Sequence, residues 1–301
     1  MTPRRFAQVD VFTDQPYLGN PLAVVLDGTG LSTAQMQTFT NWTNLSEATF
    51  VLPPTQPEAD YAVRIFCPGR ELPFAGHPTL GTCHAWLEAG GVPKGQDVVQ
   101  ECGVGLVKIK RQGNRLAFAA PPLRRGGPLD EADLQLIARG LGIARADILH
   151  HAWCDNGPQW RGVMLASADQ VLALQPDAQV LQGLDIGVIG PRGKVGVVGA
   201  HAAGDAQFEV RAFFPGNNGL CEDPVTGSLN AAVAQWLMGA DLAPSSYVAS
   251  QGTVLDRRGR VHLNQDDAGQ VWVGGDSVTC ISGTVVMVSD VMASAATLSQ
   301  R

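Results

Sequence analysis

The sequence repeats itself, and this internal duplication constrains the fold more than any other feature. Residues 63–69 (VRIFCPG) match residues 210–216 (VRAFFPG) at five of seven positions, with an offset of 147 residues. The match resumes at an offset of 151, where residues 71–77 (ELPFAGH) and 222–228 (EDPVTGS) share Glu, Pro and Gly. Because internal similarity of this kind reflects a repeated structural unit, the chain is predicted to fold as two similar halves.

Each copy has the pattern of a strand, a glycine turn and a buried helix. The matched strand segments both end in Pro-Gly, which is a turn signal. The helices are predicted to start at residues 76–77 and 227–228. The segments that follow, Leu80 to Ala89 and Leu229 to Ala240, are apolar on nearly every helical face. Helices of that kind are normally buried on all sides, so both are expected to lie in the interior.

The division between the halves is predicted within residues 121–128 (PPLRRGGP), which are too rich in proline and glycine to belong to a core. This places an N-terminal lobe at residues 1–122 and a C-terminal lobe at residues 129–301. The C-terminal tail is a candidate to return to the first lobe. The length of 301 residues fits two domains of about 150 residues each.

Two local elements of the second half can also be predicted. Leu129 to Gly142 is expected to form a helix, with Asp130 and Glu131 near its start, where the helix dipole favours negative charge. A hairpin is expected farther along the chain, with residues 252–255 and 260–263 as its two strands.

Composition and charge exclude several classes of protein. The chain is 45% hydrophobic and 16% charged and contains 35 glycines, so it can bury a large core and make many tight turns. The net charge of -7 lacks the basic surface that nucleic-acid binding requires. No long apolar segment or signal-like start is present, so a cytoplasmic protein without a membrane span is expected. The six cysteines show no CxxC spacing, which favours reduced thiols over a zinc site or a disulfide framework.

A glycine turn that opens a helix offers backbone N–H groups to an anion. This sequence has two such turns. If the halves pack about a pseudo-twofold axis, the N–H groups of Gly76, His77, Gly227 and Ser228 can hold one small carboxylate in a common cleft. The alternative is that the two glycines only permit close packing.

The duplication is most informative where the two copies differ. Leu72 in the first copy corresponds to Asp223 in the second, and His77 corresponds to Ser228. Glu47 is a third candidate, because it directly precedes an apolar strand-like run and has no clear counterpart in the second half. Glu47, His77 and Asp223 together would supply an acid/base, a proton shuttle and a second acid for moving a proton on carbon. Taken alone, Glu47 can also be read as a solvated turn residue.

These residues lie in ordered motifs through which the sequence resembles the PhzF family of phenazine biosynthesis, within the diaminopimelate-epimerase-like superfold. The resemblance spans nearly the whole chain. The motifs are Val9 to Thr13, Gly19 to Val25, Asn44 to Phe50, Glu71 to Thr79 and Glu222 to Ser228.

The resemblance implies an α+β fold of two similar lobes, each a β-barrel wrapped around a central buried helix, in a protein that is commonly a homodimer. It implies a cofactor-independent isomerase that resembles trans-2,3-dihydro-3-hydroxyanthranilate isomerase. Glu47 matches the family's acid/base, and His77 and Asp223 match its supporting polar groups. To act near neutral pH, Glu47 is expected to have its pKa raised by desolvation. No metal is implied.

Three alternatives remain open at this stage. A two-thiol epimerase or racemase of the same superfold needs a cysteine at the start of each central helix, where this chain has Ala75 and Thr226. A metal or thiol site at residues 150–155 (HHAWCD) is disfavoured, because adjacent histidines on a strand point to opposite faces. A non-catalytic module that binds a small carboxylate or another protein is the third alternative, since fold alone does not establish function.

Overall fold

The computed structural model describes residues 3–113, 115–193, 205–216 and 219–287. The chain divides into two compact units. Unit 1 comprises the described residues of 1–118 and 275–301, and unit 2 comprises those of 119–274. No helix in the described ranges has the length and apolar character that crossing a bilayer requires.

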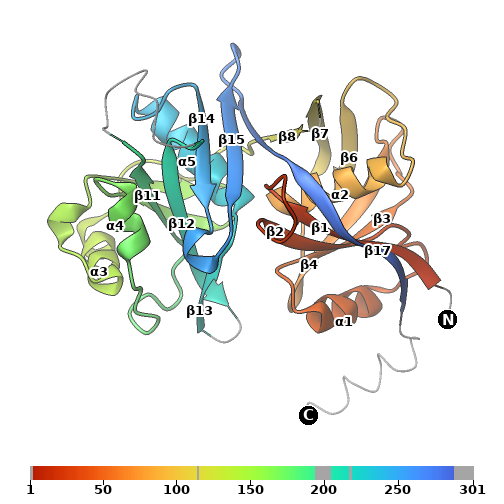
Figure 1. Cartoon of the computed structure of the whole chain (residues 1–301), viewed down its shortest axis with the longest axis horizontal. Coiled ribbons are helices and arrows are strands. Elements are labelled where there is room, and N and C mark those ends of the chain that lie inside the picture. The colour runs from red at the N-terminus through yellow and green to blue at the C-terminus, as the bar shows by residue number, and fades with distance from the viewer. Residues whose placement is uncertain (1–2, 114, 194–204, 217–218, 288–301) are drawn as a thin grey trace. The chain divides into compact units, whose positions relative to one another are not determined.

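Unit 1 consists of one hydrogen-bonded sheet and two helices (Figure 1). Its strands follow one another in space in the order β17-β1-β2-β3-β4-β6-β7-β8, and β5 pairs with β4. The pairs β2–β3 and β4–β6 are parallel and the others antiparallel. The elements are β1 (Pro3–Val11), β2 (Asn20–Val25), α1 (Thr33–Thr43), β3 (Ala48–Leu52), β4 (Tyr61–Cys67), β5 (Arg70–Leu72), α2 (Gly76–Glu88), β6 (Val98–Cys102), β7 (Gly105–Gln112), β8 (Arg115–Ala119) and β17 (Ser277–Val286).

Unit 2 is built in the same way, with three helices (Figure 1). Its strand order is β9-β10-β11-β12-β14-β15-β16, and β13 pairs with β12. The pairs β10–β11 and β12–β14 are parallel. The elements are α3 (Glu131–Leu141), β9 (His150–Asp155), β10 (Gln159–Met164), α4 (Ala168–Ala173), β11 (Ile186–Pro191), β12 (Phe208–Gly216), β13 (Gly219–Asp223), α5 (Gly227–Gly239), β14 (Ser246–Gln251), β15 (Gly259–Gln265) and β16 (Val271–Gly275).

The two units repeat one topology. From β1 to β8 and from β9 to β16, the elements come in the same order, and parallel and antiparallel pairs alternate in the same way. The register agrees as well, because Tyr61 of β4 pairs with Gln100 and its counterpart Phe208 of β12 pairs with Ala249. The prediction of two similar halves is therefore confirmed. β17 and α3 are additions to this common plan.

The helices α2 and α5 start at Gly76 and Gly227, as predicted, and nine of the thirteen residues of each are buried. α2 packs against β1, β2, β3 and β17, and α5 packs against β9 and β15. In both units a glycine allows the buried helix and a strand to pack closely. A Cβ at Gly81 of α2 would lie 2.7 Å from Leu22 Cδ2, and a Cβ at Gly187 of β11 would lie 2.4 Å from Leu229 Cδ1 of α5.

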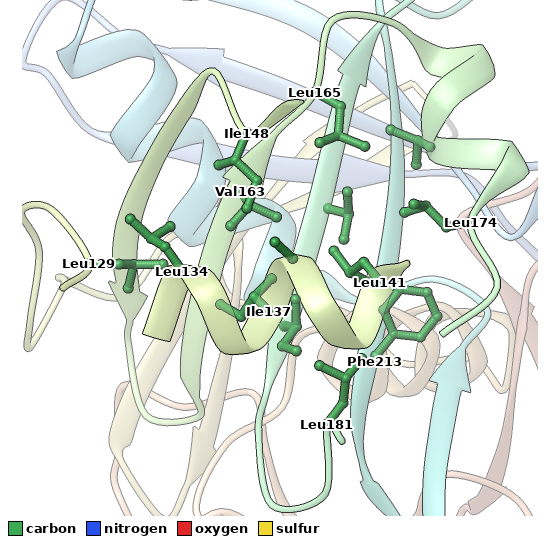
Figure 2. Packing of buried hydrophobic residues seen from close by; sticks show 14 of the residues in the cluster. Leu129, Leu134, Ile137, Leu141, Ile148, Val163, Leu165, Leu174, Leu181 and Phe213 are labelled. Atoms are coloured by element: carbon green, nitrogen blue, oxygen red, sulfur yellow. The ribbon is translucent and has the colours of Figure 1, made fainter. Parts of the chain in front are cut away.

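The helix expected at residues 129–142 is α3, and its ends follow from local chemistry. Asp130 lies at the N-cap and accepts a hydrogen bond from the Asp133 N–H at 2.8 Å. Gly142 ends the helix in the left-handed conformation with φ of 70°. Figure 2 shows the apolar side chains of α3 meeting those of the strands of unit 2, with Ile137 fully buried in the cluster.

The predicted hairpin is only partly right. β14 and β15 are antiparallel neighbours, but residues 253–255 form a 3₁₀ turn instead of a strand. The strand β14 ends at Gln251 because Gly252 has φ of +90°, a left-handed conformation that breaks the extended backbone.

We expect Ile137→Ala to lower the free energy of unfolding by about 2–5 kcal/mol, because it leaves a cavity in the buried cluster of unit 2. Gln135→Ala on the exposed face of the same helix is the control and should change it by less than about 0.5 kcal/mol. Urea denaturation of both variants measures the difference. Equal losses would show that α3 is not held by this cluster.

Candidate functional site

Glu47 and His77 meet in unit 1. Glu47 directly precedes β3, and His77 is the second residue of α2. The His77 Nε2 lies 3.4 Å from the Glu47 Oε2, and their side chains are 6% and 17% exposed. The strand and the buried helix therefore bring together two ionisable groups that are 30 residues apart in the sequence.

The second ring nitrogen of His77 faces Asn20. The Asn20 Nδ2 lies 3.4 Å from the His77 Nδ1, and Asn20 is fully buried at the start of β2. The preceding turn is held by the buried Asp10, whose Oδ2 accepts the Gly19 N–H at 2.9 Å. An amide that donates to Nδ1 leaves the imidazole proton on Nε2, the nitrogen that faces Glu47.

Burial lowers the pKa of His77 from 6.5 to about 3, so the imidazole is neutral near pH 7. The contact with Glu47 is therefore a polar contact with a neutral ring, not an ion pair, at that pH. The Cys67 thiol has its pKa raised by burial first and by the charge of Glu47 second. Both effects keep Cys67 a thiol beside the carboxyl group.

The start of α2 offers backbone donors at the same place. Helix geometry leaves the first N–H groups without a partner inside the helix. In α2 these belong to Gly76 and His77, since Pro78 has no N–H and the Thr79 N–H already bonds to the Ala75 carbonyl at 3.2 Å. Ala75 at the N-cap has no side-chain oxygen to cap them. A carboxylate bound there would lie close to the His77 ring.

Asp223 and Ser228 lie around the start of α5 in unit 2. Asp223 is the last residue of β13, and its Oδ2 accepts the Thr226 hydroxyl at 2.6 Å. Ser228 is the second residue of α5, and its Oγ accepts the Trp160 indole N–H at 3.1 Å. Gly227 begins the helix and is buried. The structure thus brings Asp223, Gly227 and Ser228 together, as it does Glu47 and His77, and joint action of the two sets stays a prediction.

The equivalences inferred from the duplication hold, with one correction. Leu72 and Asp223 end the matching strands β5 and β13, and His77 and Ser228 are second residues of matching helices.

Glu47, which was expected to lack a counterpart, has one in Asp185. Ala48 of β3 pairs with Phe66, and Ile186 of β11 pairs with the matching Phe213, so the acids before the two strands are equivalent. The two segments differ too much in sequence for this match to be seen without the strand register.

Three polar residues of these sites were missed at the level of sequence. Asn20 and Thr226 lie inside motifs that carry the family resemblance, yet nothing in their spacing pointed to His77 or Asp223. Gln251 is at the end of β14 and lies outside those motifs. A search for polar residues at the ends of the matching strands would have found Gln251.

The alternative sites gain no support. His150 and His151 lie on β9, where successive side chains alternate between faces, and the His151 Nδ1 accepts the Leu129 N–H at 3.2 Å. Burial raises the pKa of the Cys154 thiol to about 12. Within the part of the chain that the structure describes, no three His, Cys, Asp or Glu side chains gather as metal ligands. Ala75 and Thr226 occupy the N-caps of α2 and α5, where a two-thiol racemase would need cysteines.

Comparison with known proteins finds relatives along nearly the whole chain. The profile of the PhzC-PhzF family, described as phenazine biosynthesis-like protein, matches residues 9–283. A Schizosaccharomyces pombe protein named Antisense-enhancing sequence 1 is 37% identical, with the alignment covering 94% of this chain and 99% of the relative. Trans-2,3-dihydro-3-hydroxyanthranilate isomerase of Pseudomonas fluorescens is 31% identical, with 93% and 98% covered.

A solved structure shows the same fold. The phenazine biosynthesis protein of the PhzF family from Bacillus anthracis superposes with a TM-score of 0.78 at 22% identity, covering 95% of this chain and 100% of that one. The fold expected from the sequence resemblance is therefore confirmed.

The buried His77 predicts a specific dependence of stability on pH. Between about pH 6.5 and pH 3 the unfolded chain binds a proton at His77 that the folded chain does not, so stability falls as the pH falls through this window. His77→Gln should reduce the slope by up to about 1.4 kcal/mol per pH unit. Chemical denaturation at a series of pH values measures this slope.

The control is His150→Gln, which changes an exposed histidine. His84 and His151 also have pKa values lowered by burial, and both are kept in His77→Gln; His150→Gln additionally removes the small effect of the His150 charge on the pKa of His151. A slope that is the same in His77→Gln and wild type would show that His77 titrates normally in the folded protein.

Proposed function

The chain belongs to the PhzC-PhzF family, an isomerase family, and we propose that it moves a proton on carbon of a small carboxylic acid without a cofactor. The observation that carries this proposal is the contact between the Glu47 carboxyl group and the neutral His77 ring at the start of α2. An acid/base and a set of anion-binding N–H groups at one place are what such a reaction needs.

In the proposed reaction the Glu47 carboxylate removes a proton from a substrate carbon. The electron pair left on carbon is delocalised into the substrate, and its carboxylate helps to spread the charge. The Glu47 carboxylic acid then returns the proton to another carbon on the same face, so the carboxylate is regenerated and no atom is lost. The neutral His77 ring, whose Nε2 lies 3.4 Å from the Glu47 carboxyl group, gives the carboxylate a polar neighbour and does not add a charge.

We propose that the N–H groups of Gly76 and His77 at the start of α2, and those of Gly227 and Ser228 at the start of α5, bind substrate, with Asp223 as a supporting polar group. The Pseudomonas fluorescens relative is named for trans-2,3-dihydro-3-hydroxyanthranilate, which carries a carboxylate. We therefore propose this compound or a related small cyclic carboxylic acid as substrate. The resemblance also supports a cytoplasmic homodimer that binds no nucleic acid.

Glu47→Gln should lower turnover by at least about 100-fold, because it removes the group that accepts the proton. Proton NMR in D₂O with trans-2,3-dihydro-3-hydroxyanthranilate and a panel of small cyclic and amino carboxylic acids follows both isomerisation and deuterium uptake at carbon. Glu101→Gln, which changes an exposed carboxylate of unit 1 bonded to Thr55 and Gln56, is the control and should keep full activity.

A fully active Glu47→Gln protein would refute the assignment of the acid/base. Binding of panel compounds without deuterium uptake by the wild type would instead favour a non-catalytic carboxylate-binding module.

Gly76→Val and Gly227→Val should each weaken carboxylate binding by at least about tenfold, because a side chain at the first helical residue blocks the approach of the anion to the N–H groups. Gly239→Val at the end of α5 is the control, since a Cβ there meets nothing within 4 Å. Isothermal titration with the compound that shows deuterium uptake measures the affinities. Unchanged affinity in both variants would refute carboxylate binding at these helix starts.

A further inference from the structure

The duplicated fold provides an internal comparison of the two helix starts. Strand and helix positions identify four pairs of equivalent residues around them. The pairs are Leu72 and Asp223, Ala75 and Thr226, Thr79 and Asn230, and Cys102 and Gln251. In unit 1 two of these positions are Leu and Ala, whereas all four in unit 2 carry hydrogen-bonding side chains.

In unit 2 the four side chains form one connected network. The Gln251 Oε1 accepts the Thr226 backbone N–H at 3.0 Å and the Asn230 Nδ2 at 2.8 Å. The Gln251 Nε2 donates to the Thr226 Oγ1 at 2.9 Å and to the Asp223 carbonyl at 3.0 Å. Gln251 and Asn230 are fully buried and Thr226 is 7% exposed. The buried amide of Gln251 therefore has two acceptor and two donor bonds, which is its full capacity.

The direction of every bond in this network is determined. A backbone N–H can only donate, so the atom facing the Thr226 N–H must be the oxygen of the Gln251 amide. Its nitrogen then faces the Thr226 hydroxyl, which accepts from it and must direct its own proton elsewhere. That proton goes to the Asp223 Oδ2 at 2.6 Å. Asp223 is thereby held as a hydrogen-bond acceptor, which favours its charged form.

The Thr226 hydroxyl bonds to Asp223 and does not cap its helix, which is the usual role of a threonine at this position. A threonine at an N-cap usually accepts an N–H of the first helical turn. Thr226 is the N-cap of α5, yet its side chain makes no such cap bond. Its hydroxyl links Gln251 to Asp223, and the first N–H groups of α5 receive no cap from it. Glu222, the residue before Asp223, is paired with Arg211 at 2.9 and 2.7 Å.

We propose that Gln251 is a positioning residue, which acts through Thr226 to hold the Asp223 carboxylate in one orientation as a hydrogen-bond acceptor for the substrate. This inference rests on the proposed function. It assigns to Asp223 the role of an anion of fixed direction, so that the proton transferred on carbon is carried by Glu47.

The test compares Thr226→Val and Gln251→Met with two controls. Thr226→Ser keeps the hydroxyl and should behave as wild type. Gln100→Met makes the same substitution at a fully buried glutamine of unit 1, which bonds to Tyr61 and Thr79 and is linked to no acid by these bonds. Thermal unfolding of each full-length protein establishes that it is folded.

The first measurement is the titration of the Asp223 carboxyl carbon by ¹³C NMR in the ligand-free protein, assigned with Asp223→Asn. The apparent pKa of Asp223 should rise by about one pH unit, or tenfold in proton affinity, in Thr226→Val and in Gln251→Met. It should stay at the wild-type value in both controls. An unchanged titration in folded Thr226→Val and Gln251→Met, or an equal change in Gln100→Met, would overturn the proposal.

The second measurement is turnover of the compound that shows deuterium uptake. Thr226→Val and Gln251→Met should lower kcat about tenfold with a smaller change in KM, because a misdirected carboxylate still permits binding at the helix starts. Wild-type kcat in both variants would also overturn the proposal. If the proposed function is wrong, Glu47→Gln will keep full activity. The titration of Asp223 is measured without substrate, so it tests the role of Gln251 independently of that result.

Discussion

The burial of a whole helix inside each unit is the constraint on which the rest of the structure depends. α2 and α5 bury nine of their thirteen residues, so neighbouring strands must surround them closely. Close seating requires small residues, and Gly81 and Gly187 allow Leu22 and Leu229 to approach. The first N–H groups of each helix have no partner within the helix and lie at the end of the buried segment. The anion binding that we propose for these turns depends on that packing.

The two units share one topology but differ in the polar groups around the starts of their buried helices. Unit 1 holds a neutral histidine against Glu47, because burial lowers the pKa of His77 to about 3. Unit 2 places the Thr226 hydroxyl against Asp223, and this hydroxyl donates its proton to the carboxylate at 2.6 Å. The two helix starts therefore differ in the state that their surroundings favour. One places an uncharged ring beside a carboxyl group, and the other places a hydroxyl donor against a carboxyl group.

Much of the site could be predicted from the sequence, but the missing parts share one physical cause. Glu47, His77 and Asp223 lie next to turns that are visible in local sequence patterns. Gln251 reaches Thr226 from a strand 25 residues further along the chain, and no local pattern records that contact. Asp185 was missed as the counterpart of Glu47 for the same reason, since only the pairing of β11 with β12 aligns the two acids.

The sequence by itself determined the repeat, the turns, the buried helices and the family, because each of these depends on residues close together in the chain or on motifs in a constant order. Tertiary structure alone decided the neutral state of His77, its contact with Asn20 and the hydrogen-bond network that links Gln251, Thr226 and Asp223. These properties depend on desolvation and on hydrogen-bond directions between distant segments. Burial and bond direction arise when strands and helices pack, so they have no counterpart in a linear pattern of residue types.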